Sequence, residues 1–171
     1  MSRTLPFRGG PPVLSVGARA VPIVSTMVGS ISPLLLPVVT QAPIVPPFGL
    51  LVLLAWRLMR PGFWAPWAPL PLGLFDDLAS GQPVGSAMLS WTIAFLAIDM
   101  SERTLLWRDY VQDWFVAALA VTGCILAGYL FAILAGAAAP ISSVALQSLA
   151  AILVYPLVAR LCARLDVWRL R

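Results

Sequence analysis

Two long stretches without charge constrain this chain more than any other feature of its sequence. No acidic or basic residue occurs between Ala20 and Trp56 or between Trp114 and Ala159. A single transmembrane helix needs only about 20 residues, so each stretch is expected to hold two helices. A water-soluble fold of 171 residues has too little interior to bury this much apolar surface. Lipid is therefore the predicted solvent of the fold.

Composition excludes the main soluble classes. Hydrophobic residues make up 60% of the chain and charged residues 11%, against a usual charged share of about 25%, and the mean hydropathy is +0.92. These values exclude a soluble enzyme, a nucleic-acid-binding protein and a disordered chain. The net charge of +4 comes from eleven arginines, with no lysine or histidine. In a membrane chain such residues anchor cytoplasmic loops, so no nucleic-acid partner is expected.

Prolines and glycines divide the apolar stretches into about six spans, which predicts an all-α, polytopic membrane helix bundle. The third span is too short for a regular helix and contains Pro66, Pro69 and Pro71, so a broken helix is expected there. An alternative has four spans, with segments 44–58 and 61–78 re-entrant. The six predicted spans are 20–40, 44–58, 61–75, 78–98, 114–135 and 141–161.

Arginine positions predict the orientation of the bundle. With the N-terminus in the cytoplasm, all eleven arginines lie in cytoplasmic segments, as the positive-inside rule requires. We therefore expect a multi-pass protein of the cytoplasmic (inner) membrane with both termini inside. The predicted organisation is a cytoplasmic tail over 1–18, a transmembrane bundle over 19–165 and a second cytoplasmic tail over 166–171.

The sequence offers little for catalysis. Without histidine or lysine, the commonest general base and the Schiff-base nucleophile are missing. Cys124 and Cys162 lack metal-site spacing and are expected at different membrane depths, so neither a metal site nor a disulfide is predicted. Asp99 is expected nearly a membrane away from Asp76 and Asp77, which excludes an intramembrane aspartyl protease. No catalytic, cofactor-binding or metal-binding residue is predicted.

Asp76 and Asp77 still require an explanation, because carboxylates close to hydrocarbon are costly. In one interpretation both stay hydrated at the outer end of the third span. In the other, one of them points inward and hydrogen-bonds the turn over 81–85, which fixes the loop into the fourth span. The residue types alone leave both interpretations open.

Small residues recur every four positions in the predicted fifth span, on one face of the helix. Such a face allows a neighbouring helix to approach closely. Packing within the same bundle is favoured over packing against another protein. The residues of this face are Ala120, Cys124, Gly128, Ala132 and Gly136.

A more specific pattern lies between the third and fourth spans. An apolar helix ends in the form G-L-x-x-D-L, a turn of the form S-G-x-P-x-G follows, and another apolar helix begins; the residues are Gly73, Leu74, Asp77, Leu78, Ser80, Gly81, Pro83 and Gly85. This pattern resembles the signature of the rod shape-determining protein MreD family. The upstream segment 50–61, apolar and closing in Arg-Pro, is also similar to the family, whereas Asp76 and the proline-rich stretch 61–71 depart from it.

The resemblance implies a non-enzymatic membrane scaffold of the bacterial elongation machinery. Expected partners are an MreC-like membrane protein and, indirectly, MreB, RodA and a class B penicillin-binding protein; no cofactor is expected. The family is also similar in fold to the S components of energy-coupling-factor vitamin transporters, so the alternative function is a small-molecule-binding subunit. Such a site needs several polar side chains inside the bundle. The candidates are few: Ser90, Thr122, Gln147 and Ser148.

Topology gives the first testable prediction. In a cysteine-free background, Leu5→Cys and Leu170→Cys should resist an impermeant thiol reagent in intact spheroplasts, because the arginine-rich ends stay in the cytoplasm. Gln82→Cys, in the loop expected outside, should be labelled. Strong labelling at either terminus before lysis would contradict the orientation.

Overall fold

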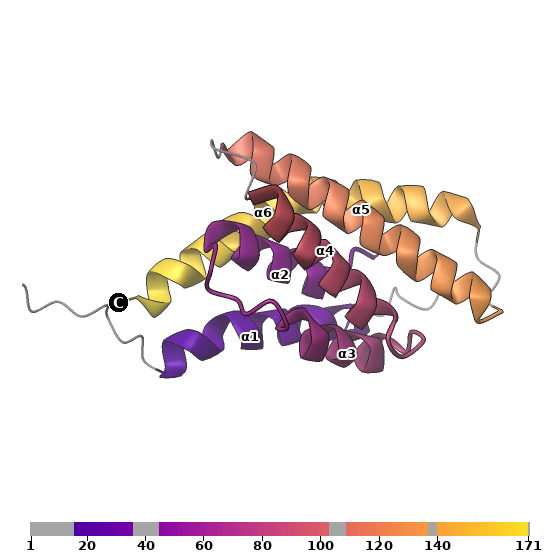
Figure 1. Cartoon of the computed structure of the whole chain (residues 1–171), viewed down its shortest axis with the longest axis horizontal. Coiled ribbons are helices and arrows are strands. Elements are labelled where there is room, and N and C mark those ends of the chain that lie inside the picture. Colours follow the sequence, from indigo (N-terminus) through magenta and orange to yellow (C-terminus); the bar gives the residue numbers. More distant parts are fainter. Residues whose placement is uncertain (1–15, 36–44, 103–108, 137–139, 171) are drawn as a thin grey trace, which may run out of the picture.

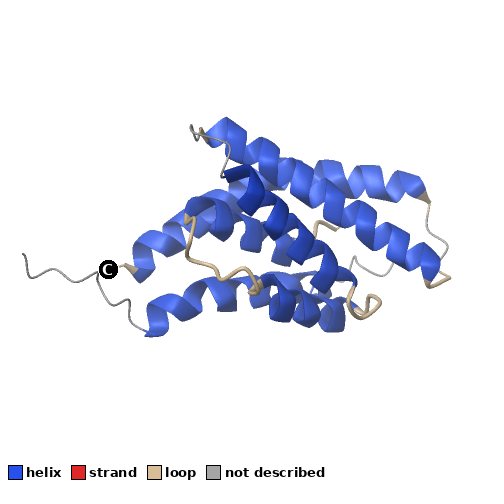
Figure 2. Ribbon diagram, in the orientation of Figure 1, coloured by secondary structure: helices blue, strands red, loops and turns tan. Residues whose placement is uncertain are grey.

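The computed structural model describes residues 16–35, 45–102, 109–136 and 140–170, and these residues form only helices and connecting turns (Figure 2). The helices are named in chain order, with a single short 3-10 helix, η1, that follows α1. Their bounds are α1 Val16–Ile31, η1 Ser32–Leu35, α2 Phe48–Met59, α3 Pro69–Ser80, α4 Ser86–Glu102, α5 Tyr110–Leu134 and α6 Ile141–Arg169. The predicted all-α class is confirmed, and six α-helices agree with about six spans.

The short helix α2 lies at the centre of the bundle (Figure 1). The other five helices form a ring in which α1 contacts α3, α3 contacts α4, α4 contacts α5, α5 contacts α6 and α6 contacts α1. Inside the ring, α2 packs against α1, α5 and α6. Every residue of α2 from Gly49 to Leu58 is buried. A helix that is apolar on all sides is stable only when other elements surround it, which explains this central position.

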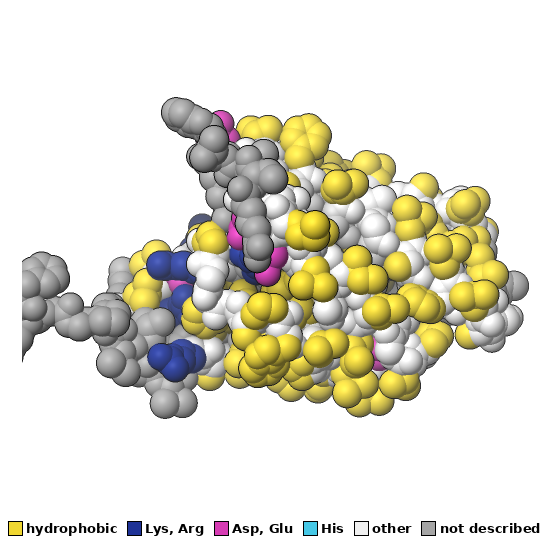
Figure 3. Space-filling model, viewed as in Figure 1, with side chains coloured by type: hydrophobic (Ala, Val, Ile, Leu, Met, Phe, Trp, Pro, Cys, Tyr) yellow, Lys and Arg dark blue, Asp and Glu magenta, His cyan; other side chains and the backbone are white. Residues whose placement is uncertain are grey.

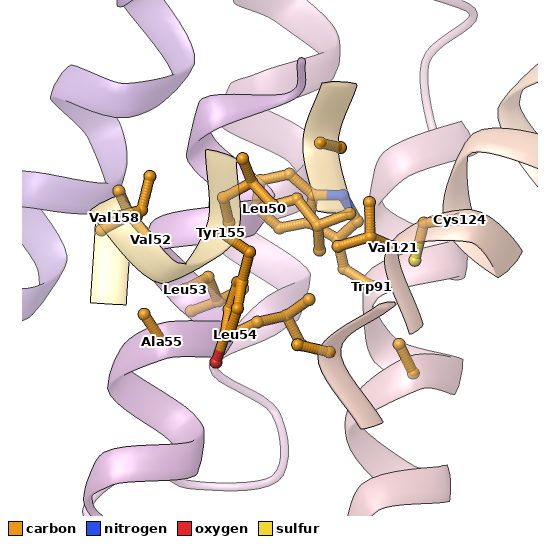
Figure 4. Packing of buried hydrophobic residues seen from close by; sticks show 14 of the residues in the cluster. Leu50, Val52, Leu53, Leu54, Ala55, Trp91, Val121, Cys124, Tyr155 and Val158 are labelled. Carbon is orange, nitrogen blue, oxygen red and sulfur yellow. The ribbon is translucent and has the colours of Figure 1, made fainter. Parts of the chain in front are cut away.

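The hydrophobic core is built around α2 (Figure 4). Leu50, Leu53 and Leu54 of α2 are almost completely buried, and Trp91 of α4 and Tyr155 of α6 pack in the same cluster. These side chains come from helices far apart in the sequence. The core therefore connects the ring to its central helix.

The outward faces of the ring are also apolar. Leu119 and Leu134 of α5 are 78% and 82% exposed. Leu153 and Leu157 of α6 are 67% and 68% exposed. Hydrophobic side chains cover most of the visible face (yellow in Figure 3). By length and composition, α5 and α6 can each cross a membrane. An apolar exterior of this kind is stable in lipid and not in water.

The boundaries of the third and fourth helices differ from the sequence prediction. Residues 61–68 form turns, and α3 begins at Pro69 and continues through both aspartates to Ser80. Helix α3 starts at Pro69, one of the prolines that were expected to break it. Proline is tolerated at the first positions of a helix, because the N–H groups there have no acceptor within the helix. The fourth helix starts at Ser86 rather than at Leu78.

Ion pairs gather at one end of the bundle. Arg57, in the last turn of α2, is 4% exposed and pairs with Asp99 and with Glu102 of α4, at 2.9 Å for Glu102. Arg60 pairs with Asp166 of α6 at 2.7 Å. Basic side chains on the visible face lie at this end, on the left of Figure 3. A buried arginine requires such partners, because an unpaired charge in an apolar interior is costly.

The C-terminal end of α6 belongs to the folded bundle. The helix continues to Arg169, beyond the boundary at 165 that the sequence suggested. The Arg169 side chain pairs with Asp166 at 2.7 Å, and its guanidinium lies 4.8 Å from the Trp56 ring centre. These contacts attach residues 166–169 to α2. The expected tail over 1–18 lies mostly outside the described residues.

Candidate functional site

The α3–α4 corner, defined here as residues 73–88, contains the whole sequence motif. Helix α3 ends at Gly81, whose φ of +68° lies in the left-handed region, and the turn closes at Gly85 with a φ of +100°. Residues with a side chain rarely adopt these values, which explains glycine at both positions. Between them the Pro83 carbonyl accepts a hydrogen bond from the Ser86 N–H at 3.0 Å. The motif therefore encodes a helix end, a tight turn and a helix start.

The Asp77 carboxylate is buried in this corner and caps the N-terminus of α4. It is 1% exposed, and Oδ2 accepts the Gly85 N–H at 2.8 Å. Oδ1 accepts the Ala87 N–H at 2.8 Å and the Ser86 hydroxyl at 2.9 Å. The first N–H groups of a helix have no partner within it, and its N-terminus favours negative charge. From the preceding helix, Asp77 supplies both the acceptors for these N–H groups and the negative charge.

Of the two sequence interpretations, the inward one describes Asp77. The expected bond to the turn is present at Gly85, and further bonds reach the first turn of α4, which the sequence did not predict. The remaining motif polar residue, Ser80, donates to the Asp76 carbonyl at 2.7 Å and is exposed. Of the two polar motif residues, Asp77 caps the N-terminus of α4 and Ser80 does not.

Gly73 lies one helical turn before Asp77 on the same face of α3. A Cβ atom at Gly73 would lie 2.6 Å from Met88 Cα and 2.7 Å from Met88 N. The backbone of α3 therefore rests directly on the first turn of α4. This contact brings the Asp77 carboxylate within reach of the α4 N–H groups.

The motif leucines face the other way. Leu74 is 37% exposed and Leu78 is 67% exposed, so within the described residues neither belongs to the core. Their role in the described fold is to present an apolar face of α3 to the surroundings.

Asp76 occupies a different environment from Asp77. It is partly buried beside the crossing of α1 and α2, where Gly29 and Gly49 allow the two backbones to touch. A Cβ atom at Gly49 would lie 3.0 Å from Asp76 Oδ1. Of the two interpretations left open by the sequence, full hydration does not describe Asp76, because the α1–α2 crossing covers part of its side chain.

The small-residue face of α5 is not one continuous packing surface, which corrects the sequence expectation. Cys124 is buried and its Sγ lies 3.5 Å from the Ser90 carbonyl of α4. A Cβ atom at Gly128, however, would meet only Gln82 Oε1, at 3.7 Å. Gly136 lies beyond the end of α5 with a φ of +86°, so it terminates the helix. The four-residue spacing places these residues on one face, but the neighbours of that face change along its length.

Gly128 and Ala132 line a cavity of about 220 Å³ at the end of the bundle that holds the α3–α4 turn. Polar residues around it include Asp76, Gln82 and Gln147. The Gln147 amide donates to the Val45 carbonyl at 2.9 Å, so it is already engaged by the protein. Both cysteines are free, in agreement with the prediction that they form no disulfide, and both are buried.

A second hollow, the α4–α5 groove, lies between these two helices on the exterior of the bundle. Its volume is about 300 Å³. No sequence pattern indicates this groove, because its residues come from two helices and follow no single spacing. Its small residues are Ala94, Ala97, Ser101, Ala120, Gly123 and Ala127.

These features define a class: an all-helical membrane bundle whose motif builds a structural corner and whose described residues bring no three metal-ligating side chains together. A family model described as rod shape-determining protein MreD matches residues 17–165. The match covers most of the chain, so the protein belongs to the MreD family, a family of shape-determining membrane proteins. No curated protein and no solved structure gives a match.

Gly73→Ala should lower stability by about 1–3 kcal/mol, because the added methyl group forces α3 away from the Met88 backbone. Gly123→Ala is the matched control, since a Cβ atom there meets nothing within 4 Å and alanine favours the helix. Unfolding of the purified variants in detergent measures the difference. Equal stability of the two variants would contradict the close contact.

Asp77→Ala should cost about 1–3 kcal/mol, because it leaves buried N–H groups at the start of α4 without acceptors. Asp77→Asn keeps one acceptor oxygen and should lose less. Asp76→Ala, at the α1–α2 crossing, should leave the α4 start intact. Amide hydrogen exchange of residues 85–88, together with unfolding in detergent, distinguishes these effects, and unchanged exchange in Asp77→Ala would exclude the cap.

Proposed function

We propose that this protein is a scaffold of the rod elongation machinery that holds the transmembrane helix of an MreC-like partner in the inner membrane. Membership of the MreD family establishes a role in rod shape determination. Through this partner, the scaffold positions MreB, RodA, a class B penicillin-binding protein and lateral peptidoglycan synthesis. The observation that carries the proposal is the α4–α5 groove.

The groove has the chemistry that a partner helix needs in lipid. Helices in a membrane associate through close packing, and small residues at the contact let two backbones approach. Gly123 lies in the groove with nothing within 4 Å of a Cβ position, so its surface is free to receive a side chain from outside. Ala94 and Ala97 of α4 line the opposite wall. A scaffold requires such a surface and no reacting group.

The alternative function, a vitamin-binding subunit similar to a transporter S component, would use the cavity beside the α3–α4 turn. Its volume of about 220 Å³ is below the roughly 300–1,000 Å³ of usual small-molecule sites. Among the polar candidates, Thr122 donates to the Ala118 carbonyl of its own helix. Gln147 donates to the backbone as well. These observations favour the scaffold.

Gly123→Leu should fill the groove and reduce retention of the MreC-like partner about tenfold, equivalent to a loss of about 1.4 kcal/mol in binding. Cells that depend on this variant should become round. The variant itself should fold normally, because the added side chain points away from the bundle. Quantitative co-purification from membranes and cell imaging measure the two effects.

Gly128→Leu is the matched control on the same helix, because its side chain enters the cavity beside Gln82 rather than the groove. It should retain the partner and support rods. Full partner retention by Gly123→Leu would exclude this groove as the docking site. A saturable rise in Tm with a vitamin would support the alternative function instead.

A further inference from the structure

A third hollow lies where the ring of helices is most open, between α1 and α6. Its volume is about 640 Å³, which exceeds the volumes of the cavity beside the α3–α4 turn and of the α4–α5 groove. Its floor is the central helix α2, at Phe48 and Val52. Its walls are apolar and include Val24 and Val28 of α1 and Leu157 and Leu161 of α6. We refer to it as the α1–α6 groove.

The length of the groove corresponds to one leaflet of a bilayer. On α1 it extends from Ala20 to Gly29, which at 1.5 Å per residue is roughly 14 Å, and Ser32 of η1 lies just beyond. Half of the hydrocarbon core is roughly 15 Å thick. An acyl chain of one leaflet therefore matches the groove in length.

The charged end of the groove identifies a matching headgroup. Two lining residues at this end, Ala20 and Trp168, lie close in sequence to arginines: Arg19 precedes Ala20 in α1, and Arg164 lies one turn before Trp168 in α6. Both arginines are exposed, and no acidic side chain in the described ranges pairs with either of them. By contrast, Arg57 and Arg60 at the same end are paired with carboxylates. Two unpaired guanidinium groups beside an apolar groove suit a phosphate.

We propose that the α1–α6 groove binds an anionic phospholipid of the cytoplasmic leaflet, with an acyl chain on α2 and the phosphate between Arg19 and Arg164. Trp168 is 67% exposed at this end, where an indole ring packs at the level of the headgroups. Basic sites between transmembrane helices on the cytoplasmic side favour anionic lipids. The lipid would fill the space between α1 and α6 beside Phe48 and Val52 of α2.

The test compares the thermal stability of the full-length protein in nanodiscs of phosphatidylcholine alone and of phosphatidylcholine mixed with phosphatidylglycerol. The wild-type protein should show a Tm several degrees higher in the anionic discs. The double variant Arg19→Gln, Arg164→Gln should lose most of this difference, and Arg19→Lys, Arg164→Lys should restore it. Inorganic phosphate added to the phosphatidylcholine discs should have no effect, because it supplies no acyl chain.

Val24→Trp should block the groove and abolish the dependence on phosphatidylglycerol. Leu130→Trp, on an exposed face of α5 away from the groove, is the matched control and should keep it. An equal Tm of the wild type in both kinds of disc would overturn the proposal, as would stabilisation by phosphate alone. Photo-crosslinking from position 24 to a protein or to a second copy, rather than to lipid, would also overturn it.

Discussion

The N-terminus of α4 is the place on which the rest of this structure depends. Its first residues, Ser86 and Ala87, are buried, and a buried N–H group without an acceptor is costly. The Asp77 carboxylate accepts hydrogen bonds from Gly85, Ser86 and Ala87, and Gly73 lets α3 lie close enough for it to do so. The two helices therefore behave as one unit. Its position against α1 and α5 closes the ring around α2.

The ring explains how a helix as short as α2 can exist in a membrane. Its length of roughly 18 Å, at 1.5 Å per residue, cannot cross the hydrocarbon core alone. Neighbouring helices cover its sides, and Arg57 and Arg60 at its end are satisfied by acidic groups from α4 and α6. The central helix thus supports the surrounding helices. The α4–α5 groove and the α1–α6 groove lie outside it, and these are the two surfaces that we propose for a partner helix and for a lipid.

Several features of the site could be predicted from the sequence, and others could not. One of the two interpretations of the adjacent aspartates had a carboxylate pointing inward, because carboxylates near hydrocarbon need partners, and Asp77 does so. The partial burial of Asp76 was not predicted, since it depends on α1 and α2 meeting at Gly29 and Gly49. The small-residue face of α5 was recognised from its spacing, but spacing says which residues share a face and not what lies opposite. Gly128 proved to border a cavity.

The sequence by itself determined the solvent, the class and the family of this protein. Charge-free stretches longer than one span require lipid, and the motif from Gly73 to Gly85 already marks a helix, a turn requiring glycine and a second helix. Only the tertiary structure decided that α2 is central, which carboxylate caps α4 and where the bundle is open. The physical reason is that composition and spacing act locally along the chain. Which surfaces are buried, paired or left open depends on contacts between helices distant in sequence.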